Sequence, residues 1–300
     1  MKKLIKKLVA PLLRIYKSYR SNDVSHVAVK ELYFGGHVVL SLPKCGGSTL
    51  HHTIQETFPF LFVYHIHALS PKGMEKFISE NAELIDKGYH DLAKAIEGHL
   101  IGAARFKLGG GMNESNSLYV VSGIRDPVAL GISQFFQNFK HHINSGDNID
   151  TKRVHEFVVH NVFKKSVMKG GIDEWFKEEI EDALGFDLLG QPFDPNIGFR
   201  IYKKSQHINH KLLLLRLESF DRISEALGEL YEVPAQLFRV VNANTSEEKG
   251  YKELYKRVLG EIQFEREFLD DIYSSKYIRK FYSEIEINRM LERWAHGVGY

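Results

Sequence analysis

Continuous apolar runs alternate along the chain with segments in which apolar residues recur at helical spacing. The runs predict strands buried on both faces of a parallel sheet, and they lie within residues 37–48, 61–67, 118–126 and 211–217. The helical spacing predicts helices over residues 71–87, through much of 151–186, from about residue 220, and from residue 251 to the end. This alternation predicts an α/β protein with three layers, in which a central parallel sheet has helices on both faces and the C-terminal part is helical.

The first apolar run ends in a glycine turn that carries one lysine. Pro43 ends the strand because it has no N–H for the ladder, and Gly46 and Gly47 let the backbone turn before a helix that begins near Thr49. Backbone N–H groups at a helix N-terminus bind anions, and Lys44 adds a full charge. The turn therefore predicts a phosphate-binding loop, although an ordinary strand-to-helix turn accounts for the same residues.

The third apolar run is followed by an arginine and by signals for the start of a helix. Asp126 suits an N-cap and Pro127 suits the first helical position. Arg125 therefore follows the carboxyl end of a strand, where ligands of open α/β sheets bind. Ser133 comes about two helical turns later, and a guanidinium and a hydroxyl can hold one phosphate together. In the alternative, Arg125 pairs with a surface carboxylate and Ser133 faces solvent.

Together the two motifs resemble those of sulfotransferases that use 3'-phosphoadenosine 5'-phosphosulfate. In that family a Pro-Lys-x-Gly-type loop binds the 5' phosphosulfate, matched here by Pro43, Lys44, Cys45, Gly46, Gly47, Ser48 and Thr49. An Arg-x-Pro segment with a serine eight residues after the arginine binds the 3' phosphate, matched by Arg125, Pro127 and Ser133. The resemblance implies a P-loop-like fold, this nucleotide as sulfuryl donor, and no required metal.

A second, narrower resemblance covers roughly residues 36–230. It is to bacterial proteins labelled putative capsular polysaccharide synthesis proteins, and it rests on residues 125–138, 173–176, 185–187, 192–194 and 214–218. This resemblance implies that the acceptor is a hydroxyl of a capsular polysaccharide or of a glycan precursor.

Sulfuryl transfer requires a group that takes the proton of the attacking hydroxyl, and histidine titrates in the appropriate range. We select His99, because Glu97-Gly98-His99-Leu100 resembles the Gly-His segment of uronyl 2-O-sulfotransferases, whose histidine is the proposed base. Glu97 is the alternative base, and a purely structural His99 is the other alternative. Lys44 is expected to stabilise charge on the departing phosphate oxygens.

Four further histidines precede His99. His65 and His67 alternate on a predicted strand and share a face, but no third ligand at fixed spacing accompanies them, so we predict no metal site. His51 and His52 follow the loop on a predicted helix. Because adjacent helical residues face different directions, at most one of these two points at the loop.

Composition limits the remaining classes of protein. A chain of 300 residues that is 43% hydrophobic can bury one large core. Its single cysteine excludes an internal disulfide and indicates a reduced thiol in a cytoplasmic protein. A nucleophilic Cys45 is the alternative, because a helix N-terminus and Lys44 would lower the pKa of its thiol. The net charge of +2 says nothing about nucleic acid, and no basic stripe with interleaved aromatic residues supports nucleic acid as a partner.

The N-terminal residues differ in composition from the rest. Residues 1–20 place lysines and aliphatic residues at roughly helical spacing, which predicts a basic amphipathic segment over residues 1–30. Such a segment can lie on an anionic surface, which would make the protein peripheral at the inner membrane, or it can pack on its own domain. It is too short to span a bilayer, which needs about 20 apolar residues. Residues 31–300 predict a single sulfotransferase-like α/β domain with a helical extension from about residue 250.

The sequence therefore predicts a sulfotransferase that moves a sulfuryl group from 3'-phosphoadenosine 5'-phosphosulfate to a polysaccharide or glycan hydroxyl. One alternative is a kinase-like phosphoryl transferase, which the absence of a Walker loop and of a clear magnesium-binding aspartate disfavours. The other is a non-enzymatic capsule assembly factor with a decayed nucleotide site.

Overall fold

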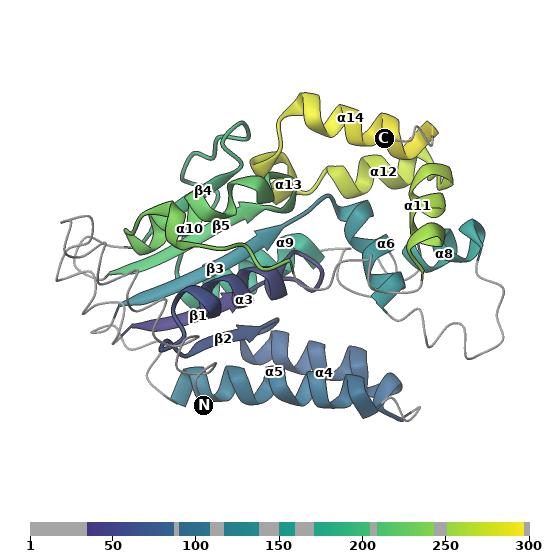
Figure 1. Ribbon diagram of the computed structural model, residues 1–300. Coiled ribbons are helices and arrows are strands. Elements are labelled where there is room, and N and C mark those ends of the chain that lie inside the picture. The colour runs from purple at the N-terminus through teal and green to yellow at the C-terminus, as the bar shows by residue number, and fades with distance from the viewer. Residues whose placement is uncertain are drawn as a thin grey trace. The chain divides into compact units, whose positions relative to one another are not determined.

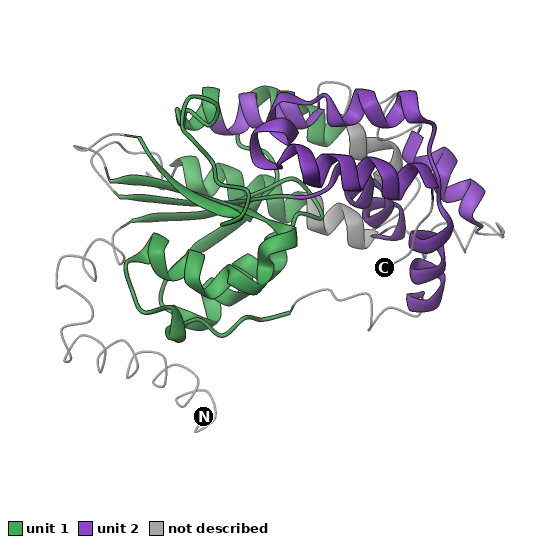
Figure 2. Cartoon of the chain, turned by 90° about the horizontal axis from the view of Figure 1, so that it is seen from above, with its two compact units in different colours: residues 1–124, 181–243 green, residues 125–180, 244–300 purple. Residues whose placement is uncertain are grey.

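The computed structural model describes residues 35–86, 90–108, 117–137, 150–159, 171–204, 209–242 and 251–296. The chain divides into two compact units, of which the first comprises residues 1–124 and 181–243 and the second residues 125–180 and 244–300 (Figure 2). The amphipathic segment predicted for residues 1–30 lies outside the described residues. The predicted domain boundaries stay predictions.

The first unit is built on a five-stranded sheet (Figure 1). Across the sheet the strands are β2 (Val63–Ile66), β1 (Gly36–Leu40), β3 (Leu118–Ile124), β5 (His210–Arg216) and β4 (Phe199–Lys203). The first four are parallel to one another, and β4 is antiparallel to β5. This confirms the α/β class, the mostly parallel sheet and the four predicted strands. The antiparallel edge strand β4 is an addition that the hydrophobic pattern did not predict.

Helices pack on both faces of this sheet. On one face, α3 (Gly47–Thr57) and α10 (Ile223–Tyr231) cover a core that includes Val39 of β1 and Val121 of β3. On the other face, α5 (His90–Leu108) packs on β2, where the ring of Phe106 contacts Tyr64. The predicted helix over residues 71–87 is confirmed as α4 (Pro71–Asp86), which packs against α5. β3 and β5 are buried along their whole length, as a sheet covered on both faces requires.

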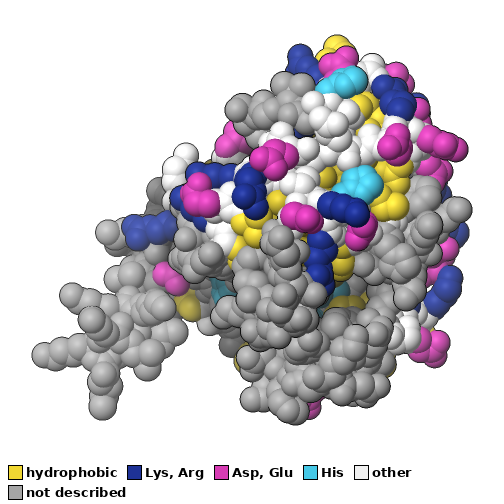
Figure 3. Space-filling model, turned by 90° about the vertical axis from the view of Figure 1, so that its right-hand side faces the viewer, with side chains coloured by type: hydrophobic (Ala, Val, Ile, Leu, Met, Phe, Trp, Pro, Cys, Tyr) yellow, Lys and Arg dark blue, Asp and Glu magenta, His cyan; other side chains and the backbone are white. Residues whose placement is uncertain are grey.

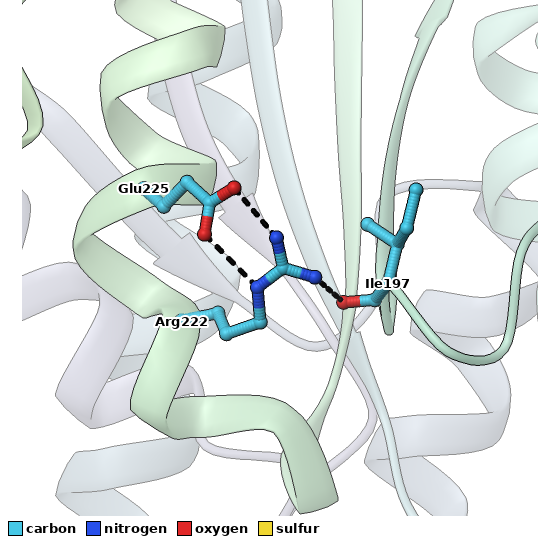
Figure 4. A network of polar contacts seen from close by, with 3 residues as sticks. All are labelled: Ile197, Arg222 and Glu225. Carbon is cyan, nitrogen blue, oxygen red and sulfur yellow. Dashed lines mark hydrogen bonds and ion pairs between the residues drawn. The ribbon is translucent and has the colours of Figure 1, made fainter.

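One arginine ties the start of α10 to the loop that precedes β4 (Figure 4). Arg222 lies at the end of the short helical turn η3 (Leu217–Arg222), and its Nε and Nη2 donate to the two carboxylate oxygens of Glu225 at 2.9 and 2.6 Å. Its Nη1 donates to the carbonyl of Ile197 at 2.7 Å. The guanidinium also lies over the ring of Phe199, 5.1 Å from its centroid. This contact is at the surface, where an ion pair contributes little to stability.

The second unit is built of helices and contains no strand among its described residues. Its helices are α6 (Pro127–Gln137), α8 (Thr151–Phe157), α9 (Gly171–Trp175), α11 (Lys252–Glu261), α12 (Arg266–Tyr273), α13 (Lys276–Phe281) and α14 (Glu284–His296), with a π-helical turn, η2 (Phe176–Asp182), crossing the boundary between the units. Aromatic contacts form much of its core: Phe136 meets Tyr255 at 5.0 Å between ring centroids, and Phe176 meets Tyr277 at 5.0 Å. The predicted helical C-terminal part is therefore confirmed.

Charge is mixed on the face that Figure 3 displays, where the basic and acidic side chains of described residues alternate.

Among the described residues, no helix has both the length and the apolar character that crossing a bilayer requires.

Candidate functional site

The turn between β1 and α3 has an unusual backbone. Lys44 and Gly46 both adopt left-handed conformations, with φ of 70° and 79°. A left-handed conformation is ordinary for glycine, but for a residue such as lysine it costs on the order of 1 kcal/mol and is uncommon outside functional turns. The strand, turn and helix occur in the predicted order, while the P-loop-like assignment stays a prediction.

Gly46 is required by packing as well as by its backbone. A side chain there would overlap the ring of Phe220 and lie 3.0 Å from Leu217 Cδ1. Gly46 is also the N-cap of α3, and no side chain caps this helix. The first N–H groups of a helix have no partner within the helix, so the start of α3 presents backbone donors and a partial positive charge. This is an arrangement that binds phosphate or sulfate groups.

The predicted loop residues differ in exposure. Cys45 is only 1% exposed, so its thiol packs in the interior and only its backbone can serve a ligand. Buried thiols of this kind are generally unreactive. Thr49 is also buried, at 8% exposed, whereas Lys44 and Ser48 are half-buried. Lys44 and Ser48 are therefore the loop side chains best placed to meet an external group.

A cluster of histidines lies beside this turn in the first unit. The rings of His67 and His99 have centroids 4.1 Å apart, and His65 lies 5.1 and 5.3 Å from them. His99 comes from the middle of α5, while His65 is on β2 and His67 follows it. His51 of α3 stacks on His65 at 5.7 Å, and the exposed His52 lies at the margin of the group.

Hydrogen bonds to carbonyl oxygens settle the tautomers of two of these rings. Nδ1 of His99 donates to the carbonyl of His65 at 2.9 Å, and Nδ1 of His67 donates to the carbonyl of Ser41 at 2.7 Å. Because a carbonyl oxygen only accepts, Nδ1 carries the proton in both rings. The neutral ring of each therefore has its lone pair on Nε2, which is the state that a general base requires.

Burial keeps these histidines neutral. Burial, opposed by the hydrogen bond to His65, lowers the pKa of His99 below its usual value. Burial, the neighbouring His99 and the charge of Lys44 lower the pKa of His67 to about 3, despite its bond to Ser41. The effect of Lys44 on His67 links the turn to the histidine cluster, so the predicted cation and the predicted base belong to one neighbourhood.

The two candidate bases point in different directions. Glu97 and His99 are two positions apart on α5, which places their side chains about 200° apart around the helix axis. Glu97 is exposed, whereas His99 is half-buried among the other histidines. Only His99 of the two therefore lies in the histidine cluster, and the assignment of a catalytic base stays a prediction.

Two buried polar atoms beside the turn have no hydrogen-bond partner among the described residues: Ser41 Oγ and His65 Nε2. A side-chain atom at Gly47 would lie 2.6 Å from the first and 2.5 Å from the second. Both atoms therefore face the start of α3. Each unpaired buried group costs about 1–3 kcal/mol, a cost that native structures rarely bear without another reason.

The histidines do not form a metal centre in this structure. Over the described parts of the chain, no three or more His, Cys, Asp or Glu side chains are arranged so that they could hold a metal ion. His51 also uses Nε2 to donate to the carbonyl of Val63 at 3.1 Å, which ties that nitrogen to the sheet.

The other predicted motif belongs to the second unit. Arg125 is half-buried, and Ser133 is half-buried on α6. The predicted helix start is confirmed, because Pro127 is the first residue of α6 and Asp126 Oδ1 accepts from the N–H groups of Val128 and Ala129 at 2.9 and 3.4 Å. Each phosphate motif is thus formed locally in its own unit, and the ligand roles of these residues stay predictions.

Sequence reasoning missed two features of these sites. The approach of His67 to His99 joins residues in β2 and α5, for which the sequence offers no signal beyond the alternation of His65 and His67. Asp126 was predicted only as a helix cap, but Tyr273 and Trp294 also donate to its carboxylate, at 2.7 and 2.8 Å. Both partners lie more than 140 residues away in the chain.

Comparison with known proteins gives one similarity. No curated protein and no solved structure matches the chain. The matched segment of a family model begins after the Lys44 turn, His99, Arg125 and Ser133, and it covers slightly less than half of the sequence. Residues 147–283 match the family described as putative capsular polysaccharide synthesis protein.

Proposed function

We propose that this protein is a sulfotransferase that moves a sulfuryl group from 3'-phosphoadenosine 5'-phosphosulfate to a hydroxyl of a capsular polysaccharide or glycan precursor. The observation that carries the proposal is the combination of an uncapped helix N-terminus, a left-handed Lys44, and a neutral histidine with its lone pair on Nε2 in the same neighbourhood. The family match of residues 147–283 supports the capsule pathway.

In this proposal the loop binds the 5' phosphosulfate. The N–H groups at the start of α3 and the Ser48 hydroxyl donate to its oxygens, and the Lys44 ammonium lies at the phosphate that departs. Arg125 and Ser133 bind the 3' phosphate. No step requires a metal ion, since the charge that develops is met by the lysine and the backbone.

The transfer itself needs one proton acceptor. The acceptor oxygen forms a bond to sulfur as the bond between sulfur and the 5' phosphate oxygen breaks, and that electron pair leaves on adenosine 3',5'-bisphosphate. The hydroxyl proton goes to Nε2 of His99, whose Nδ1–H is held by the carbonyl of His65. That bond also stabilises the imidazolium that forms, because the donor strengthens when the ring becomes charged.

A thermal-shift titration tests the nucleotide class. A ligand that binds only the native state stabilises it by about 2.7 kcal/mol at one hundred times its dissociation constant. We expect adenosine 3',5'-bisphosphate to raise the melting temperature more than ATP does. A larger shift with ATP would indicate the kinase-like alternative, and no shift with either nucleotide would indicate an assembly factor with a decayed site.

Transfer is then measured with a sulfur-labelled donor and purified capsular polysaccharide. Label that remains with the polysaccharide after gel filtration is the expected result. Nucleotide binding without any transfer to polysaccharide or oligosaccharide acceptors would contradict the proposed reaction.

A further inference from the structure

Asp126 is a buried carboxylate whose two oxygens are both held by hydrogen bonds. It is 5% exposed, and Oδ1 accepts from the N–H groups of Val128 and Ala129 at the start of α6. Oδ1 also accepts from the Tyr273 hydroxyl at 2.7 Å, and Oδ2 accepts from Nε1 of Trp294 at 2.8 Å. A buried carboxylate is tolerated only when donors of this kind replace water.

The last two donors come from the C-terminal helices of the same unit. Tyr273 is the last residue of α12 and is 1% exposed, and Trp294 lies on α14 and is fully buried. The carbonyl of Trp294 in turn accepts from the N–H of Phe264, so the indole is fixed through its backbone as well. An aspartate at an N-cap needs only the helix N–H groups. The two aromatic donors therefore do more than cap α6, because they replace water around the buried carboxylate and connect it to α12 and α14.

The residues on either side of Asp126 show what its hydrogen bonds to Tyr273 and Trp294 control. Arg125 precedes it directly, and Pro127 begins α6, the helix that carries Ser133. Proline fixes its own φ, so little freedom is left between Asp126 and the helix. The orientation of Asp126 therefore sets the backbone direction at Arg125 and the direction of the α6 axis.

We infer that Tyr273 and Trp294 are positioning residues for the 3' phosphate site, acting through Asp126 on Arg125 and Ser133. This inference rests on the proposed function and gives the C-terminal helices a role in it: they hold the arginine and the serine in the geometry that distinguishes a 3',5'-bisphosphate from a nucleotide without the 3' group. A preorganised binding site binds its ligand more tightly, because the side chains of the site lose less conformational freedom on binding.

The test compares two nucleotides in calorimetry, adenosine 3',5'-bisphosphate and AMP, on the full chain. Tyr273→Phe removes one hydroxyl and leaves the ring in place. We expect it to weaken the bisphosphate about 5-fold or more, the lower end of typical coupling between sites, and to change AMP by less than about 2-fold. Trp294→Phe removes the other donor and should act in the same direction, which keeps the test usable if one variant folds poorly.

Two controls separate positioning from general support of the fold. Tyr202→Phe removes another buried hydroxyl, on β4, that has no hydrogen-bond partner among the described residues, and it should leave the ratio of the two affinities unchanged. In an Arg125→Ala background, Tyr273→Phe should cause a smaller loss of bisphosphate affinity than it does in the wild type, because the arginine is gone and only Ser133 remains to be positioned.

The outcomes distinguish the inference from the function on which it rests. If the wild-type protein binds the two nucleotides equally, the proposed 3' phosphate site is wrong and the inference falls with it. If the wild type prefers the bisphosphate and Tyr273→Phe and Trp294→Phe keep that preference, only the inference is wrong. Equal weakening of both ligands, or a full additional loss in the Arg125→Ala background, would also overturn it.

Discussion

The turn before α3 and the start of α6 both place a charged residue at a helix N-terminus, yet they treat polar groups in opposite ways. At the first, the N-cap is Gly46 without a side chain, Lys44 is held in a left-handed conformation, and Ser41 Oγ and His65 Nε2 are buried without a partner among the described residues. At the second, Asp126 receives four donors.

Under the proposed function, the turn before α3 binds the ligand directly, whereas Asp126 supports a neighbouring residue that does so. Strain and unpaired polar groups are tolerated where an external group compensates for them. A fully paired carboxylate makes its surroundings rigid and has little left to offer a substrate. The following predictions test this contrast, beginning with the largest expected effect.

His99→Ala should lower kcat about 10²- to 10⁴-fold, the range for loss of a positioned proton acceptor, with little change in nucleotide affinity. Glu97→Gln should keep most of the turnover, because Glu97 is exposed and points away from the cluster. The assay is transfer of labelled sulfate, with the exposed His52→Ala as the control. Loss of turnover in Glu97→Gln with retention in His99→Ala would make the glutamate the base.

Lys44→Ala should lower the transfer rate about 10²-fold or more, comparable to removal of one preorganised charge-stabilising donor. Alanine and lysine tolerate the left-handed backbone about equally, so the fold should survive. Single-turnover rates and circular dichroism provide the comparison, with Lys203→Ala, an exposed lysine on β4, as the matched variant. Near-normal turnover in purified Lys44→Ala would remove this lysine from the mechanism.

Asp126→Ala should destabilise the protein by about 3 kcal/mol or more, because each buried donor that loses its acceptor costs about 1–3 kcal/mol and a helix cap contributes about 1 kcal/mol. Urea unfolding followed by tryptophan fluorescence measures the change. A loss below about 1 kcal/mol would mean that the network can rearrange around the missing carboxylate.

Stability should fall as pH drops from 7 to 5, because burial lowers the pKa of four histidines in the folded protein: His51, His65, His67 and His99. Their folded pKa values lie below the unfolded value of about 6.5, so the unfolded state takes up more protons in this window, and each such histidine contributes a slope of up to about 1.4 kcal/mol per pH unit. With the pKa of His67 lowered to about 3, His67→Asn should flatten the slope measured in urea. An unchanged slope would show that folding does not lower the pKa of His67.

Ser41→Ala should have the smallest effect on stability, between no change and a gain of about 1 kcal/mol, because it removes a buried hydroxyl that has no partner among the described residues. The same substitution tests whether Ser41 Oγ meets the nucleotide, since it should then weaken adenosine 3',5'-bisphosphate in calorimetry. A clear loss of stability would show that the hydroxyl is hydrogen-bonded. The polar groups beside the turn would then resemble the paired carboxylate of Asp126 more closely.

Local patterns were sufficient for much of the fold. β1, β2, β3 and β5 are predictable because strands buried on both faces must be continuously apolar. The start of α6 is predictable because Asp126 and Pro127 are chemically suited to adjacent positions at a helix start. β4 was not predictable, since its five residues mix polar and apolar positions and its pairing is antiparallel at the edge of the sheet.

The candidate sites also combine features that contiguous residues predict with contacts that only packing creates. The glycine turn with its lysine is contiguous in sequence, and so is the Arg125 segment, so the residues alone were enough to predict two anion-binding motifs. Only the tertiary structure decided that His99 donates to the carbonyl of a residue 34 positions earlier, and that Asp126 meets side chains 147 and 168 positions later. A sequence pattern reports the propensity of neighbouring residues, whereas these contacts depend on how separate elements pack, and packing brings together residues with no local relation to one another.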